Sequence, residues 1–317
     1  MPLLSVRLFG KISVQYDERI VTGLDACKVR ELFCYLLLYR QSPHPRESLA
    51  ALFWGDSSTA QSKKYLRQAL WELQTTLNGH PHPGHDGILL VEPEWVRLNP
   101  AAELWLDAAV FEQAFGLARG VAGSALDARR VEALQGAAQL YHGDLMEGCY
   151  QDWCLCERER LQSAYLIMLD KLMGYCEAHQ EYEAGLAYGQ HIMRYERARE
   201  CTHRRLMRLH YLAGDRTAAL RQYTRCVEAL AEELDVKPAK RTVTLYEQIR
   251  ADEFNRSALP SPGPDPTPDA ERARFSEAPK VVEVMDHLKQ LRVVLTGIRG
   301  RVQEDIKAVD LVLRRRQ

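Results

Sequence analysis

Apolar residues recur every three or four positions over residues 62–77, SKKYLRQALWELQTTL, where Leu66, Leu70, Leu73 and Leu77 share one face. This spacing predicts a helix with one buried stripe. The remaining face carries Lys63, Lys64, Arg67, Gln68, Trp71 and Gln74. The helix therefore exposes cations, amides and a tryptophan together, and the neighbouring elements indicate what this face binds.

The elements around this helix predict a small domain. Residues 3–20 alternate as short strands, residues 28–40 form an apolar helix, and a second helix opens at Pro45 with Glu47 in its first turn. After a polar, turn-rich segment, ILLVEPEWVRL (88–98) predicts two strands joined by a tight turn. Sheet, three helices and hairpin, in this order, predict a winged helix, whose third helix enters the major groove.

On this hypothesis the exposed face of the third helix reads DNA. Lysine and arginine suit phosphates and guanine, and Gln68 suits adenine. Exposed cations are in most proteins simply solvated, and residues 1–105 carry 11 Lys+Arg against 11 Asp+Glu, a net charge of zero. Clustering favours DNA, because the sequence has three cations and no acid between Asp56 and Glu72. The hairpin has an acidic tip, and its predicted DNA-facing residues are Trp95 and Arg97.

From about residue 106 the pattern is helical throughout. Shifting the sequence by 34 residues places Leu172 on Leu206 and Gly185 on Ala219. A period of 34 with small residues at matched positions is typical of tetratricopeptide repeats, whose paired helices approach closely. The predicted helix pairs are 157–178 with 181–195 and 199–213 with 216–234, preceded by a helix near 129–141 and followed by a capping helix at 239–253.

Beyond Ser257 the chain changes character. Prolines at every second position from Pro260 to Pro268 predict an extended, semi-rigid linker over residues 257–279. Residues 280–317 carry a heptad pattern in which nine of ten a and d positions are apolar, which predicts a coiled coil. The linker separates this helix from any core, so we predict a homodimer or higher oligomer rather than packing onto the repeats. The predicted oligomerisation residues are Leu288, Leu291, Leu295, Ile298, Val302 and Val309.

Composition narrows the class of protein. The 317 residues include 42 basic and 43 acidic ones, so any nucleic-acid surface must be local. The sequence has no signal-peptide pattern and no apolar run of membrane-spanning length, which predicts a soluble, cytoplasmic protein. The DNA-binding hypothesis adds that it is nucleoid-associated. It also has no CxxC pair, GxxxxGK[ST], GxSxG or HExxH. We therefore expect no catalysis, no metal site and mostly buried, reduced cysteines.

Several motifs together resemble the SARP family of bacterial transcriptional activators. They run almost unbroken over residues 3–253 and include KVRELFCYLLLYR, RESLAALFWGD, KKYLRQALWELQ, LYHGDLMEG, DWCLCERERL, and AALRQY followed by EELDVKP. The resemblance implies an OmpR-type winged helix over residues 1–105 and a bacterial transcriptional activator domain of tetratricopeptide-like helices over residues 106–256. The expected fold class is therefore mainly α.

The resemblance also implies binding to direct-repeat promoter sites and recruitment of RNA polymerase holoenzyme. The residues expected at double-stranded DNA are Gln61, Ser62, Lys63, Lys64, Arg67, Gln68 and Trp71 of the third helix, with Arg46, Trp95 and Arg97 beside them. The loop before that helix corresponds to the polymerase-facing loop and contains Trp54, Gly55, Asp56 and Ser57. The chain departs from the family at Trp71, Glu72 and Gln74, where relatives are often more basic. A linker and heptad segment also replace the ATPase or sensor domains of larger members.

Two alternatives stay open. The neutral N-terminal half also suits a regulatory adaptor that does not bind DNA and uses its repeats for protein interaction. Separately, the arginine-rich run over residues 194–210 suits an anionic effector such as a nucleotide, although nearby acids favour a solvated helix pair. The candidate effector residues are Arg194, Arg197, Arg204 and Arg205.

Overall fold

The computed structural model describes residues 4–17, 19–24, 26–78 and 87–254. They belong to one compact unit that ends at Phe254. The predicted linker and coiled coil lie outside the described residues, and so do the six heptad residues Leu288, Leu291, Leu295, Ile298, Val302 and Val309. Self-association through the heptads therefore stays a prediction.

The first sheet has four strands in the order β3-β2-β1-β7. They are β1 (Leu4–Arg7), β2 (Ser13–Tyr16), β3 (Arg19–Ile20) and β7 (Leu104–Leu106). β1 pairs antiparallel with β2 and parallel with β7. Leu4 and Val6 are buried while Arg7 is exposed, as a strand with one face on the core requires. β7 is not among the predicted strands, because three residues give too short an alternation to recognise.

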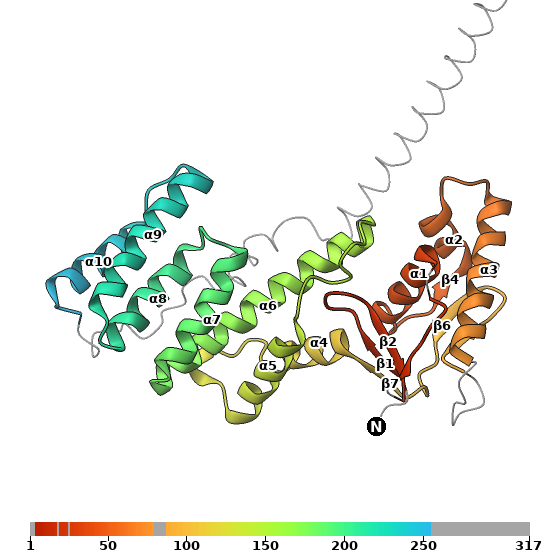
Figure 1. The fold of residues 1–317 in the computed structure, drawn as a ribbon, viewed down its shortest axis with the longest axis horizontal. Helices are drawn as coiled ribbons and strands as arrows, with labels where there is room; N and C mark the ends of the chain where they lie inside the picture. Colours follow the sequence, from red (N-terminus) through yellow and green to blue (C-terminus); the bar gives the residue numbers. More distant parts are fainter. Residues whose placement is uncertain (1–3, 18, 25, 79–86, 255–317) are drawn as a thin grey trace, which may run out of the picture. The chain divides into compact units, whose positions relative to one another are not determined.

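Three helices follow the first three strands, as predicted. They are α1 (Cys27–Leu38), α2 (Arg46–Trp54) and α3 (Thr59–Asn78). α1 is apolar on most sides and is surrounded by the core, where its Leu32, Phe33 and Leu36 are all fully buried. α2 begins directly after Pro45, whose extended backbone leads into the first turn. α2 and α3 pack on each other and form the two helices of a helix-turn-helix (Figure 1).

The second sheet forms the wing. β5 (Leu89–Val91) and β6 (Trp95–Leu98) make the predicted hairpin. β4 (His44–Pro45), which the sequence pattern does not predict, pairs with the other edge of β6 and gives the order β4-β6-β5. The predicted winged helix is confirmed.

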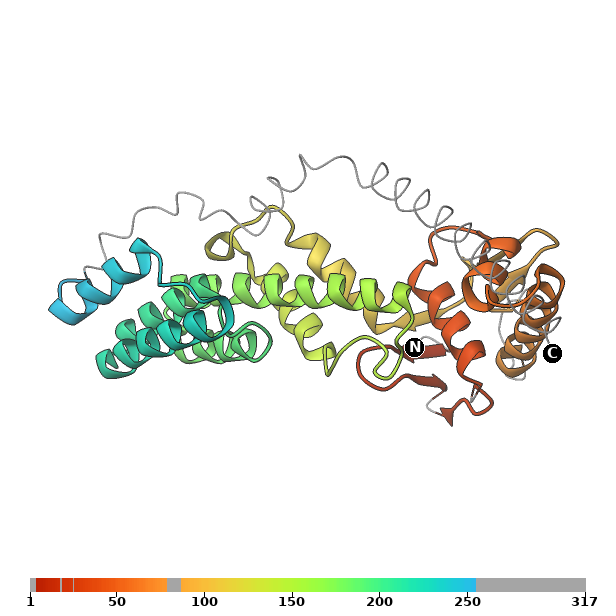
Figure 2. The same cartoon turned by 90° about the horizontal axis from the view of Figure 1, so that it is seen from above.

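The second half of the unit is entirely helical, as predicted. Its helices are α4 (Asp107–Leu117), the short 3-10 helix η1 (Gly123–Ala125), α5 (Ala128–Leu140), α6 (Asp152–His179), α7 (Tyr182–Tyr195), α8 (Glu200–Leu212), α9 (Arg216–Leu234) and α10 (Lys240–Ala251). α6 pairs with α7 and α8 pairs with α9, and α10 packs on the second pair. Both views show α6 extending beyond α7 toward the winged helix (Figures 1 and 2).

The 34-residue period has a physical basis in these helix pairs. Gln180 ends α6 in the left-handed conformation with φ 64°, and Gly214, 34 positions later, has φ 86° after α8. Between α7 of the first pair and α8 of the second, a Cβ on Gly185 would lie 3.1 Å from Leu209 Cδ1, and one on Gly189 would lie 2.5 Å from Leu206 Cδ2. Small residues at these positions therefore let successive helices approach closely, as the sequence predicted.

A second close approach joins η1 to α6. A Cβ on Gly123 would lie 2.4 Å from the carbonyl oxygen of Lys171 and 3.1 Å from Cα of Gly174. Both neighbours are backbone, so they cannot move aside as the end of a flexible side chain can. The two glycines thus allow the chain to cross α6 at backbone contact.

The two halves are joined by a buried carboxylate. Asp107, the first residue of α4, accepts hydrogen bonds from the amides of Leu8 (2.8 Å) and Phe9 (3.0 Å). Its other oxygen accepts from the amide of Ala108 at 2.7 Å. Burial raises the pKa of the Asp107 carboxyl, although these three amides and the charge of Arg7 act in the opposite direction.

The loop before α6 completes this junction. Gly10 donates its amide proton to Asp144 O at 2.9 Å, and Met146 donates to Leu8 O at 2.8 Å. Phe9 stacks at an angle against Tyr141, with ring centroids 4.8 Å apart. The HGDLMEG part of the family motif is therefore a docking segment for the chain that leaves β1.

We expect Asp107→Ala to lower the free energy of unfolding by about 3 kcal/mol or more. The substitution leaves three buried amides without an acceptor, and each unsatisfied group costs roughly 1–3 kcal/mol. Urea unfolding followed by circular dichroism measures the loss. Asp152→Ala is the control, because Asp152 is exposed in the first turn of α6. Equal, small effects of both substitutions would show that the junction does not depend on this carboxylate.

We expect Gly123→Ala to destabilise the protein by about 1–3 kcal/mol, since the new methyl group meets rigid backbone. Gly136→Ala in α5 should instead stabilise the protein. A Cβ there meets no atom within 4 Å, and alanine in a helix interior is favoured over glycine by about 0.5–1 kcal/mol. Thermal unfolding of the two variants should give shifts in Tm of opposite sign.

Candidate nucleic-acid interface

α3 separates its side chains as the sequence predicted. Leu66, Ala69, Leu70, Leu73 and Leu77 are each at most 3% exposed and pack into the core. The exposed residues of the predicted DNA face are Gln61, Lys63, Lys64, Arg67, Gln68 and Trp71. Residues three and four apart share a helix face, so these side chains are presented together.

The free cations of this face are Lys64 and Arg67. Both are exposed, and within the described part of the chain no carboxylate forms an ion pair with either. Trp71 lies one turn further along α3 and is 67% exposed, which is unusual for the largest side chain. A surface with two unpaired cations, an amide at Gln68 and an indole has the chemistry that phosphates and base edges require.

The structure corrects one residue of the predicted set. Ser62 is only 4% exposed. Its hydroxyl donates to the carbonyl of Trp54 at 2.7 Å, with the carbonyls of Ser57 and Ser58 also near. Ser62 is therefore turned toward the α2–α3 turn and holds it in place, and it does not belong to the exposed face.

The predicted polymerase-facing loop is this same turn. Gly55 and Asp56 are exposed, and Ser57 is half-buried. The Trp54 ring is also half-buried and packs against Phe53 and Tyr65, with ring centroids 5.9 and 6.5 Å apart. The part of the loop that a partner can reach is therefore centred on Gly55 and Asp56.

The wing lies next to α2. Trp95, 41% exposed, and Arg97 alternate along β6 with the buried Val96. Arg46, the first residue of α2, donates its guanidinium to the Glu92 carbonyl at 3.1 Å. Arg46 is half-buried by this contact, so it supports the hairpin turn, and its place at DNA stays a prediction.

Comparison with known families identifies the helical half. Residues 106–250 match the family profile described as "Bacterial transcriptional activator domain". These residues therefore correspond to a bacterial transcriptional activator domain, called the activator domain below. The match confirms the resemblance to SARP-type transcriptional regulators.

A solved structure has the same fold over most of the chain. Mycobacterium tuberculosis EmbR, in complex with a low affinity phosphopeptide, is similar with a TM-score of 0.61 and 19% sequence identity. The similarity covers 90% of this chain and 72% of that chain. No curated protein matches the sequence at a significant level. Among the described residues, no helix combines the length and the apolar character that crossing a membrane needs.

The activator domain contacts the winged helix through α1. Tyr39 donates its hydroxyl to Glu157 of α6 at 3.0 Å, and burial together with this carboxylate raises the pKa of Tyr39. The rings of Tyr35 and Trp153 meet edge to face, with centroids 5.3 Å apart. These residues hold the winged helix against α6. No pattern in the sequence indicates their role, because contacts between residues more than 100 positions apart leave no periodic signal.

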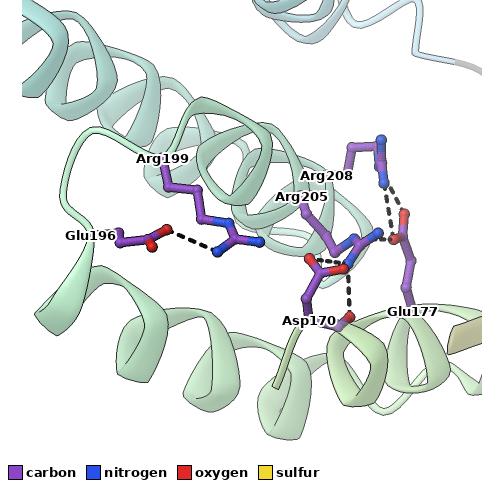
Figure 3. A network of polar contacts seen from close by, with 6 residues as sticks. All are labelled: Asp170, Glu177, Glu196, Arg199, Arg205 and Arg208. Carbon is purple, nitrogen blue, oxygen red and sulfur yellow. Dashed lines mark hydrogen bonds and ion pairs between the residues drawn. The ribbon is translucent and has the colours of Figure 1, made fainter. Parts of the chain in front are cut away.

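The arginines considered for an effector are paired inside the activator domain. Arg205 of α8 donates to Asp170 of α6 at 2.7 Å and lies 3.6 Å from Glu177, which also accepts from Arg208 (Figure 3). Arg197 pairs with Glu232 at 3.1 Å and Arg204 lies 3.8 Å from Glu200, whereas Arg194 is exposed at the end of α7. Arg197, Arg204 and Arg205 thus reach different carboxylates, and the four candidates do not converge on one site. An anionic effector there stays a prediction that these contacts disfavour.

We expect Ser62→Ala to lower the free energy of unfolding by about 1–2 kcal/mol, because it leaves the Trp54 carbonyl without this donor. Ser48→Ala is the matched control, since Ser48 is exposed on α2. Urea unfolding measures both variants. If the Ser62→Ala protein has wild-type stability but binds DNA more weakly, Ser62 contacts DNA as the sequence predicted.

Proposed function

We propose that this protein is a sequence-specific DNA-binding transcriptional activator that places α3 in the major groove. The observation that supports this most directly is the exposed face of α3. Lys64, Arg67, Gln68 and Trp71 lie together on it, while the opposite stripe of leucines fastens the helix to its domain. A winged helix offers the third helix to the groove in this way.

Each side chain has a role that follows from its chemistry. Lys64 neutralises a phosphate, and Arg67 contacts a phosphate or the acceptor edge of a guanine. Gln68 pairs with the donor and acceptor of an adenine, and Trp71 makes apolar contact beside it. Trp95 and Arg97 of the wing contact the neighbouring backbone. Since the winged helix has no net charge, these local contacts and not a general positive field provide the affinity.

The activator function requires a contact with RNA polymerase holoenzyme. We propose that it involves the exposed Gly55 and Asp56 in the turn before α3, which the resemblance to SARP regulators indicates. The proposal is supported by the rigid position of this turn, where the buried Ser62 hydroxyl donates to the Trp54 carbonyl at 2.7 Å. Binding to direct repeats would follow if the heptad segment joins two copies, since linkage raises the effective concentration of the second winged helix.

We expect the double variant Lys64→Glu/Arg67→Glu to bind its promoter sites at least about 100-fold more weakly, because two contacts worth roughly 1–3 kcal/mol each are replaced by repulsion. Its stability should stay within about 0.5 kcal/mol of wild type, as both residues are exposed. The measurement is footprinting of the full chain on genomic fragments, with circular dichroism to confirm folding.

Lys237→Glu/Lys240→Glu is the control for net charge, since both lysines are exposed near the start of α10. This control should keep promoter binding. A Lys64→Glu/Arg67→Glu protein that occupies its sites normally would contradict the proposal. Wild-type protein without any sequence preference at low salt would favour the regulatory adaptor.

A further inference from the structure

An ion pair bridges the two helices of the helix-turn-helix at the start of the candidate DNA face. Lys63 Nζ of α3 lies 2.6 Å from Oε1 of Glu47, which stands in the first turn of α2. Both side chains are open to solvent, at 48% and 79% of their full exposure. The hydrogen bond from Lys63 lowers the pKa of the Glu47 carboxyl and so favours its charged form.

Lys63 differs in this respect from its neighbours. Lys64 and Arg67 have no ion-pair partner among the described residues, although all three cations belong to the same exposed half of α3. α3 therefore presents two free positive charges and a third that is already neutralised. Such exposed pairs contribute little to stability, so the need to hold α2 against α3 does not explain this one. The buried leucines of α3 and Leu49 and Phe53 of α2 provide that contact.

The consequence is electrostatic. Binding of a protein to any duplex depends on how many phosphates its cations neutralise, and each such contact steepens the decrease of affinity with salt. A lysine held by a carboxylate does not add to that number. The carboxylate also places a negative charge near the DNA, which opposes binding to every sequence alike.

We propose that Glu47 limits the sequence-independent part of DNA binding by keeping Lys63 away from the phosphates. This inference rests on the proposed function and adds a residue to it. Glu47 acts through Lys63 as a positioning residue, and it touches no base. Its presence makes contacts to bases, such as that of Gln68, a larger share of the total affinity.

The test is a salt titration of the full chain by fluorescence anisotropy on two duplexes, one of random sequence and one selected by the wild-type protein from a random library. The variants are Glu47→Gln, Lys63→Gln, the double variant of both, and Lys64→Gln as the matched control. Circular dichroism verifies that each is folded.

The Glu47→Gln variant should gain one phosphate contact. Its plot of log affinity against log salt should be steeper by about 0.9 on both duplexes, an extra loss of roughly 3-fold between about 50 and 200 mM salt. Lys63→Gln should leave the wild-type slope unchanged and should abolish the gain in the double variant. Lys64→Gln should flatten the slope by about 0.9, because that lysine is free.

Two results would overturn the inference while the proposed function stands. If Lys63→Gln flattens the wild-type slope as much as Lys64→Gln does, Lys63 leaves Glu47 in the complex. If Glu47→Gln weakens binding to the selected duplex alone, Glu47 reads a base. If neither the wild-type protein nor any variant binds either duplex at low salt, the proposed function itself is contradicted, and the inference fails with it.

Discussion

The buried carboxylate of Asp107 is the interaction on which the arrangement of the two halves depends. It follows β7 directly in the chain and accepts the amide protons of Leu8 and Phe9, which follow β1. The residues that follow the parallel strands β1 and β7 are thus hydrogen-bonded to each other, and α4 begins at this point. The Asp144–Met146 segment docks on the same stretch of backbone. The winged helix therefore leads into the activator domain through a fixed corner and not through a free linker.

The two halves also meet through α1. α1 supports α3 from one side and contacts α6 from the other, through Tyr39 with Glu157 and Tyr35 with Trp153. α1 therefore connects the start of α6 with the helix that carries the candidate DNA face. Ser62 and Trp54 in turn hold the turn between α2 and α3 in a defined position. The candidate DNA face, the exposed turn and the start of α6 are therefore joined by a continuous set of contacts.

The repeats use charge in a different way from α3. In the activator domain, Arg205 and Arg208 lie between successive helices and are matched by Asp170 and Glu177 (Figure 3). These arginines bind the first repeat to the second. On α3, Lys63 has such a match, whereas Lys64 and Arg67 have none among the residues that the structure describes. A cation that serves folding and one that is available to a ligand look alike in composition, and the presence of a carboxylate from another element distinguishes them.

The sequence by itself determined the elements and the face of α3. Periods of 2, 3.6 and 34 residues report which side chains point inward, because burial must repeat with the geometry of strand, helix and helix pair. For this reason the winged helix, the repeats and the exposed set at Lys64, Arg67, Gln68 and Trp71 were predictable. Only the tertiary structure decided which strands and side chains that are distant in the sequence contact one another. The short strands β4 and β7 form because they pair with β6 and β1. The Ser62 hydroxyl turns inward to the Trp54 carbonyl, and Glu47 forms an ion pair with Lys63. Such pairings join residues at no fixed spacing, so no pattern along the chain records them.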